Sequence, residues 1–144
     1  YYRDADGNEI PGLGLFSYYT VAPSSRKKRC IGNIVIKAEI DGQKVNVVGF
    51  ENHGGQTQDV KTPFGEVLYG NGNCSKSSAE GYTEKNVIAT YLHGPCLAKN
   101  PEVTDHMIKY CLSRNTGEEV KLQPLDDKLE KECRKVMLSR LLNK

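Results

Sequence analysis

The sequence has 144 residues, of which 38% are hydrophobic and 26% charged, and its formal net charge at pH 7 is +2. This composition is typical of one soluble globular domain and excludes a disordered chain. No apolar run approaches the roughly 20 residues that cross a bilayer, which excludes a membrane-spanning helix, and the N-terminus has neither a start methionine nor a signal-peptide pattern.

The first part of the chain is expected to connect elements rather than to build a core. Residues 4–15 hold a turn signal and the glycine-rich stretch Pro11-Gly12-Leu13-Gly14. A basic run at 26–29 follows in a Pro/Ser-rich loop, while the other basic residues are scattered. Four residues form too small a charged surface for nucleic acid, so we expect a solvated loop and no nucleic-acid partner.

A β-hairpin is the strongest local prediction. Residues 32–40 alternate apolar and polar side chains, the pattern of a half-buried strand. The apolar positions are Ile34, Ile36, Ala38 and Ile40. Asp41-Gly42 favours a tight reversal into the valine-rich segment 44–50, which predicts the second strand.

Two more strands are predicted downstream. One covers 65–69, and the polar loop 70–81 that follows is expected to make turns and to contribute nothing to a core. The other covers 86–92, where apolar residues run together as in a more fully buried strand. His93 stands directly after it, where the backbone must turn. Such a residue is either a general base at a sheet edge or a histidine that satisfies a strand end.

Two helices are expected at the carboxyl end. Asn100-Pro101 reads as an N-cap followed by proline at the first helical position, and this helix should end near Gly117. A second helix is expected from about Pro124. The apolar stripe of the first helix would be Val103, Met107, Ile108, Cys111 and Leu112, and that of the second Leu129, Cys133, Val136, Met137 and Leu141. We therefore expect Cys111 and Cys133 to be buried.

The cysteines indicate neither disulfides nor a metal site. There are five, widely spaced, without a Cys-x-x-Cys pair. Reduced thiols of a cytoplasmic protein are the simpler interpretation. His93 and Cys96 have the spacing of two metal ligands, but no second pair accompanies them, so we expect no metal.

These elements make the hairpin and the closing part of an α/β domain, without the βαβ run that would open a parallel sheet. Several ordered motifs resemble the cobyric acid synthase-like branch of class I glutamine amidotransferases. They are Gly12-Leu13-Gly14-Leu15, Arg29 with Gly32-Asn33, Gly49 to Gly55, Gly70 to Asn73, Glu80-Gly81, and Thr90 to Pro95 with Lys99-Asn100-Pro101. The resemblance covers nearly the whole chain and weakens after about Arg114.

The resemblance implies an α/β fold: the carboxy-terminal portion of a class I amidotransferase (flavodoxin-like) domain over residues 1–144. It also implies glutamine as substrate, with the released ammonia passed to a Mur-ligase-like partner that uses ATP. This chain itself would need no cofactor. The motifs are most similar to those of the glutaminases that serve amidation of the peptide-stem glutamate of lipid II in peptidoglycan synthesis.

The resemblance also assigns roles to particular residues. His93 matches the catalytic histidine, which takes and returns the proton of a cysteine nucleophile. Arg29 matches the position that holds the carboxylate of glutamine, although its sequence context equally allows a loop arginine in water. Asn52, His53 and Gly54 match a loop beside the glutamine pocket, for which a purely structural turn is the alternative.

The chain departs from the family pattern in two places. The family's nucleophile lies on a strand-to-helix elbow upstream of Tyr1, so we expect the 144-residue chain alone to be inactive. Cys96 is no substitute, because an elbow glycine pattern is lacking around it. The carboxylate that many class I enzymes place two residues after the histidine is replaced by Pro95. Asp105 and Glu51 are the nearest candidates within the chain.

Two other functions stay open at this point. One is the amidotransferase part of cobyric acid synthase, which uses the same ammonia chemistry in cobalamin biosynthesis. The other is a nonenzymatic binding module that kept the fold. In either case an open sheet edge would favour self-association of the chain.

Overall fold

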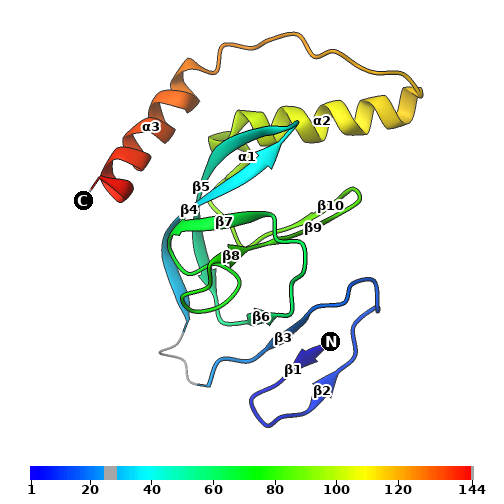
Figure 1. Cartoon of the computed structure of the whole chain (residues 1–144), viewed down its shortest axis with the longest axis vertical. Helices are drawn as coiled ribbons and strands as arrows, with labels where there is room; N and C mark the ends of the chain where they lie inside the picture. Colours follow the sequence, from blue (N-terminus) through cyan, green and yellow to red (C-terminus); the bar gives the residue numbers. More distant parts are fainter. Residues whose placement is uncertain (25–28, 144) are drawn as a thin grey trace.

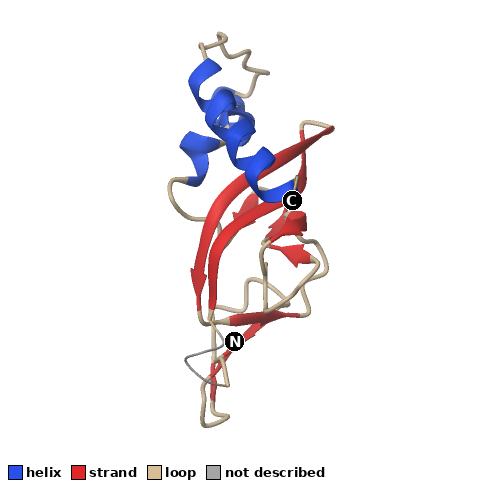
Figure 2. Ribbon diagram, turned by 90° about the vertical axis from the view of Figure 1, so that its left-hand side faces the viewer, coloured by secondary structure: helices blue, strands red, loops and turns tan. Residues whose placement is uncertain are grey.

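The computed structural model describes residues 1–24 and 29–143 and shows an elongated α/β molecule (Figure 1). The helices lie at one end, short strands from the first 21 residues lie at the other, and a long hairpin runs between them (Figures 1 and 2). The expected fold class, a mixed α/β partial domain, is confirmed. Residues 26–28 of the basic run lie outside the described residues.

The hairpin consists of β4, Cys30–Ile40, and β5, Gln43–His53, which pair along their whole length. Asp41 and Gly42 both have positive φ, 49° and 75°, as the mirror-image turns of tight hairpins require. The predicted hairpin is therefore confirmed. β5 nevertheless continues three residues beyond the predicted end, through the motif that the sequence placed in a loop.

The central sheet has the order β5-β4-β7-β8, all antiparallel, where β7 is Gly65–Tyr69 and β8 is Ala79–Glu80. The prediction of β7 is confirmed. The expectation that residues 70–81 contribute nothing to the core is wrong, because Asn73 and Glu80 are buried. Their side chains bond backbone groups across the loop and toward residue 91, which composition alone does not reveal.

A second sheet lies at the amino-terminal end, in the order β2-β1-β3-β6. Its strands are β1 Tyr2–Arg3, β2 Glu9–Ile10, β3 Tyr19–Val21 and β6 Gln56–Gln58. β1 and β3 are parallel, and the other pairs are antiparallel. Because β6 follows β5 after only two residues, this sheet is tied directly to the hairpin end that carries His53.

The predicted buried strand at 86–92 is wrong. Only Val87–Ala89 forms a strand, β10, which pairs with β9, Tyr82–Glu84, and is partly exposed. The next residues leave this pairing, and His93 makes an isolated bridge with Phe50 of β5. The apolar run at 86–92 thus pairs first with β9 and then with β5. Its apolar pattern does not indicate this division.

Three helices complete the chain: α1 Cys96–Lys99, α2 Pro101–Thr116 and α3 Lys128–Leu142. The predicted bounds of α2 are confirmed, and Gly117 adopts the left-handed conformation, φ 76°, at its carboxyl end. The side chain of Asn100 makes no capping bond. Instead it bonds the backbone N–H of Val48 at 2.9 Å and the carbonyl of Val48 at 2.8 Å, which joins the helices to β5.

The expected apolar stripes of α2 and α3 are mostly exposed. Within α2 only Pro101 and Val103 are buried, and α3 has no buried residue among its described positions. Cys111 and Cys133 are exposed, so the prediction of their burial is wrong. Arg134 of α3 makes two hydrogen bonds to the carboxylate of Glu102, at 2.5 and 2.6 Å. This ion pair, rather than apolar burial, joins α3 to α2.

The core lies between the hairpin and the segment before α2. Its buried members are Ile34, Ile36, Ala38, Ile40, Val47, Phe64, Leu92 and Val103. None of the helices among residues 1–24 and 29–143 is long and apolar enough to cross a membrane.

Candidate active site

His93 is held at the edge of β5 by two backbone hydrogen bonds. Its N–H donates to the carbonyl of Phe50 at 2.7 Å, and its carbonyl accepts from the N–H of Phe50 at 3.2 Å. Residues paired in this antiparallel way direct their side chains to the same face of a sheet. The imidazole therefore shares a face with Phe50, and His93 is exposed.

The same face carries two further predicted residues. Asn52 lies two residues beyond Phe50, about 7 Å along the strand, and alternate residues share a face. The guanidinium of Arg29 donates to the side-chain oxygen of Asn52 at 3.0 Å. A Cβ placed on Gly54 would lie 3.2 Å from a terminal nitrogen of Arg29. The structure thus brings Arg29, Asn52 and Gly54 together, beyond His93 along β5.

His53 lies on the opposite, buried face of β5 and is 6% exposed. Its ring stacks on Tyr91 with centroids 3.7 Å apart and an interplanar angle of 3°. Nδ1 lies 2.8 Å from the carbonyl oxygen of Gly55, and Nε2 has no hydrogen-bond partner among the described residues. From the buried face of β5, His53 is thus placed to support the Gly54-Gly55 backbone.

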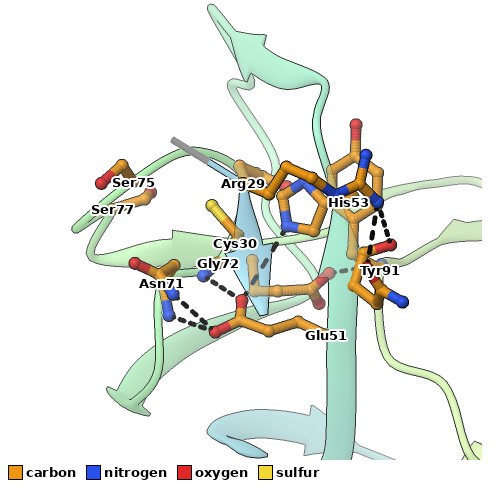
Figure 3. A network of polar contacts seen from close by, with 12 residues as sticks. Arg29, Cys30, Glu51, His53, Asn71, Gly72, Ser75, Ser77 and Tyr91 are labelled. Atoms are coloured by element: carbon orange, nitrogen blue, oxygen red, sulfur yellow. Dashed lines mark hydrogen bonds and ion pairs between the residues drawn. The ribbon is translucent and has the colours of Figure 1, made fainter. Parts of the chain in front are cut away.

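Glu51 is a buried carboxylate beside His53, 1% exposed. It accepts hydrogen bonds from the backbone and side chain of Asn71, at 2.8 and 2.9 Å, and from the N–H of Gly72 at 3.1 Å (Figure 3). One oxygen lies 3.9 Å from Nε2 of His53, too far for a hydrogen bond. Burial alone would raise the pKa of Glu51, but attraction to His53 and the donated bonds outweigh it, so the pKa is lowered.

Glu80 is a second buried carboxylate, fully shielded from solvent. It accepts hydrogen bonds from the N–H of Tyr91, at 2.6 Å, and from the hydroxyl of Thr90, at 3.0 and 3.1 Å to its two oxygens. Burial raises the pKa of Glu80 to about 7, although these bonds oppose the shift. Sequence reasoning gave Glu80 no role, because a single acid in a polar loop carries no local signal of burial.

Neither carboxylate candidate from the sequence reaches His93. Asp105 is exposed on α2, and Glu51 lies on the opposite face of β5. Within residues 1–24 and 29–143 no side chain makes a hydrogen bond to the imidazole of His93, and no group of three or more His, Cys, Asp or Glu residues could hold a metal ion.

The environments of four of the five cysteines do not favour a nucleophile. Burial raises the pKa of Cys30 and of Cys96, so both thiols stay protonated at neutral pH. Cys96 packs against the core and lies 3.8 Å from the amide nitrogen of Asn100. Cys111 and Cys133 are exposed on α2 and α3.

Gly49 allows the segment before His93 to approach β5 closely. A Cβ at this position would lie 2.9 Å from Cβ and 3.0 Å from Cγ of the buried Leu92. Real Cβ atoms do not approach other carbon atoms so closely, and the β-carbon of Leu92 cannot yield without moving its backbone. Glycine is therefore required here by the placement of Leu92 and, one residue later, of His93.

Gly49→Ala is expected to destabilise the protein by about 1–2 kcal/mol, because overpacking forces the backbone of Leu92 away from β5. Urea unfolding measures this change. Gly12→Ala is the matched control, since a Cβ there would meet only the backbone nitrogen of Tyr1, at 3.8 Å. Equal stability of the two variants would show that the approach of Leu92 does not require glycine.

Comparison with known proteins identifies the family. Residues 1–101 match the CobB/CobQ-like glutamine amidotransferase domain. The chain is 37% identical over 139 residues to the lipid II isoglutaminyl synthase (glutamine-hydrolyzing) subunit GatD of Staphylococcus aureus (strain N315), which covers 96% of the chain and 54% of that relative. It is 37% identical over 134 residues to the subunit of the same name from Streptococcus pneumoniae (strain ATCC BAA-255 / R6), covering 92% and 50%.

A probable cobyric acid synthase of Methanococcus maripaludis is 29% identical over 116 residues, covering 78% of the chain and 23% of that relative. The chain spans about half the length of the first two relatives. The resemblance carried by the sequence motifs is thereby confirmed. The chain belongs to the CobB/CobQ-like glutamine amidotransferase domain family.

Proposed function

We propose that the protein to which this chain belongs is a glutaminase that hydrolyses glutamine and delivers the ammonia to a partner ligase. The observation that carries the proposal is one exposed sheet face that holds the imidazole of His93 and, about 7 Å along β5, the paired Arg29 and Asn52. A histidine beside a cation that could bind a carboxylate is the arrangement needed to hydrolyse an amino-acid side-chain amide.

His93 acts as the general base and then as the general acid. It takes the proton of a cysteine thiol, and the thiolate attacks the amide carbon of glutamine. When the tetrahedral intermediate collapses, the C–N bond breaks and His93 returns the proton to the departing ammonia. Water, deprotonated by the same imidazole, then attacks the thioester. The C–S bond breaks, glutamate is released, and the imidazolium returns the proton to the leaving thiolate.

The attacking cysteine is proposed to come from outside these 144 residues. For four of the five cysteines, the raised pKa values of Cys30 and Cys96 and the exposed helical positions of Cys111 and Cys133 support this assignment. The 144-residue chain by itself should then release no ammonia from glutamine. Turnover by this chain alone would contradict the assignment.

The glutamine pocket is proposed to include Arg29, Asn52, His53 and Gly54. The guanidinium of Arg29 would meet the α-carboxylate as a two-pronged donor, oriented by its bond to Asn52. Gly54 lets the backbone approach the substrate, and His53 contributes from the buried side through its contact with the Gly55 carbonyl. No cofactor is assigned to this chain, and ATP would be used by the ligase.

Arg29→Ala is expected to raise KM for glutamine by about 10-fold or more with little change in kcat, because one charge-assisted contact to the substrate is lost. Arg29→Lys should restore part of the loss, since an ammonium keeps the charge but not the fork. Steady-state ammonia release measures both constants. Lys37→Ala, which removes an exposed cation from β4, is the control. An unchanged KM in Arg29→Ala would favour the alternative of a solvated loop arginine.

The acceptor of the ammonia is proposed to be the peptide-stem glutamate of lipid II, in the cytoplasm and through a Mur-ligase-like subunit. The 37% identity to two lipid II isoglutaminyl synthase subunits over more than nine-tenths of the chain supports this reading. The 29% identity to a probable cobyric acid synthase supports a corrinoid carboxylate as the second candidate. No observation favours a binding module without activity.

One experiment tests the proposal as a whole. The full protein is purified with its ligase and supplied with ATP, amide-labelled [15N]glutamine, and either lipid II or a corrinoid carboxylate. We expect glutamate formation and transfer of 15N to lipid II. Label in the corrinoid would replace the first acceptor by the second, and no glutamate formation with either would refute the glutaminase.

A further inference from the structure

Three consecutive backbone N–H groups lead to the histidine, and each has a defined acceptor. The N–H of Tyr91 donates to Glu80 at 2.6 Å, that of Leu92 to the hydroxyl oxygen of Thr90 at 3.0 Å, and that of His93 to Phe50 at 2.7 Å. Only the last of these is a strand-like bond. The first two are made by side chains, which replace the sheet pairing that residues 90–92 lack.

Glu80 and Thr90 form one connected unit. The hydroxyl of Thr90 donates to both oxygens of Glu80 while it accepts from the N–H of Leu92. Through these bonds a single carboxylate on β8 fixes the backbone of residues 90–92. The apolar contact of Leu92 with Gly49 holds the same segment from the other side.

The environment of Glu80 is unusual for a carboxylate. It is fully buried, and no Lys or Arg forms an ion pair with it among the described residues. Burial raises the pKa of Glu80 to about 7, since neutralising charge is lacking. An apolar side chain would cost less free energy to bury. What the carboxylate of Glu80 provides instead is an acceptor for the N–H of Tyr91 and the hydroxyl of Thr90.

We propose that Glu80 is a positioning residue for His93, which it holds in the reacting geometry through the hydroxyl of Thr90 and the N–H of Tyr91. This inference rests on the proposed glutaminase function of the same site. Glu80 does not touch the imidazole or the substrate. It acts by fixing the two residues that precede Leu92-His93, so its loss should displace the imidazole rather than weaken substrate binding.

The chain offers a graded set of substitutions. Glu80→Ala removes the acceptor, whereas Glu80→Gln keeps one oxygen for Tyr91 and an amide that can donate to Thr90. Thr90→Val removes the hydroxyl at nearly constant shape, and Thr90→Ser keeps it. Thr83→Val on β9 is the matched control, because the side chain of Thr83 makes no hydrogen bond within the described residues.

In the full protein with its ligase we expect Glu80→Ala and Thr90→Val to lower kcat for glutamine about 10- to 100-fold. KM should stay within about threefold of its value in the parent, which is the full protein without a substitution. Glu80→Gln and Thr90→Ser should stay within about threefold in both constants, and Thr83→Val should match the parent. Circular dichroism and the melting temperature confirm folding, and rates are normalised to folded protein. Should Glu80→Ala fail to fold, Thr90→Val, which keeps the carboxylate, decides.

A second readout does not need activity. In the same protein, 13C-labelled histidine reports the ring environments, and the His93 signal is assigned by its loss in His93→Ala. The Cε1–H signal of His93 should move in Thr90→Val and stay in place in Thr83→Val. Parent protein without glutaminase activity would refute the proposed function, and the spectrum alone would then judge the positioning. A folded Thr90→Val variant with both kcat and the His93 signal unchanged overturns the inference, as does Glu80→Gln impaired as much as Glu80→Ala.

Discussion

Replacing His93 with alanine is expected to lower kcat for glutamine hydrolysis by at least about 100-fold in the protein that supplies the nucleophilic cysteine. The imidazole is exposed on the face that carries Arg29 and Asn52, and its backbone is fixed by two hydrogen bonds to Phe50. Without it, neither the thiol nor the departing ammonia has a proton-transfer partner on this face. KM should change little, because the imidazole is not assigned to binding. Ammonia release under saturating glutamine measures the effect.

His106→Ala is the matched control for this experiment. His106 lies on α2, where its Nδ1 is 2.7 Å from a carboxylate oxygen of Asp41 in the hairpin turn. Its loss removes the same side chain at a distance from the proposed site and should leave kcat unchanged. Full activity of His93→Ala, or an equal loss in both variants, would remove His93 from the mechanism.

Glu80 is expected to make stability fall as the pH rises from about 4.5 to about 7. Its pKa is raised from 4.5 to about 7 in the folded protein by burial, so the folded state binds its proton more tightly than the unfolded state does. The stabilisation is complete below pH 4.5 and is lost as the pH rises through 7. A shift of this size corresponds to about 3 kcal/mol in the free energy of unfolding.

Comparison with Glu80→Gln isolates this contribution, because the variant has no ionisable group at the site. Urea unfolding at several pH values should show the variant gaining about 3 kcal/mol relative to the parent between pH 4.5 and 7. The neighbouring Glu51 acts in another window: its lowered pKa gives stability that is lost only as the pH falls below the usual range of a carboxyl. Glu66→Gln, at an exposed position of β7, is the control. A difference independent of pH would show that Glu80 keeps an ordinary affinity for its proton.

Local signals in the sequence predicted the elements that depend on near neighbours. The alternation at 32–40 and the Asp41-Gly42 turn specify a hairpin whose strands need only each other. Pro101 and Gly117 mark the two ends of α2 in the same local way. These features depend on residues a few positions apart in the sequence, so they could be predicted without knowledge of the tertiary structure.

The errors concern contacts between distant residues. The apolar run at 86–92 divides between β9 and β5, and the carboxamide of Asn100 bonds β5 instead of its own helix. The exposed stripes of α2 and α3 show that amphipathic spacing reports a face able to pack, without indicating what packs on it.

For the candidate site, the motifs led to residues that the structure brings to one face, His93, Arg29 and Asn52. The motifs did not indicate which of these residues lie on which face of β5, because the prediction ended that strand at residue 50. With the strand extended to His53, alternation alone places Asn52 outward and Glu51 and His53 inward. The role of Glu80 depends on a fold contact with Thr90 and Tyr91, for which no spacing rule exists.

The weak attachment of α3 determines which part of the molecule unfolds first. A helix without buried residues gains little from the hydrophobic effect, and the bidentate pair of Arg134 with Glu102 is its main specific tie to α2. Residues 117–127, which connect the two helices, form neither helix nor strand. The carboxyl-terminal helix is therefore a low-stability unit whose amide protons exchange before those of the hairpin.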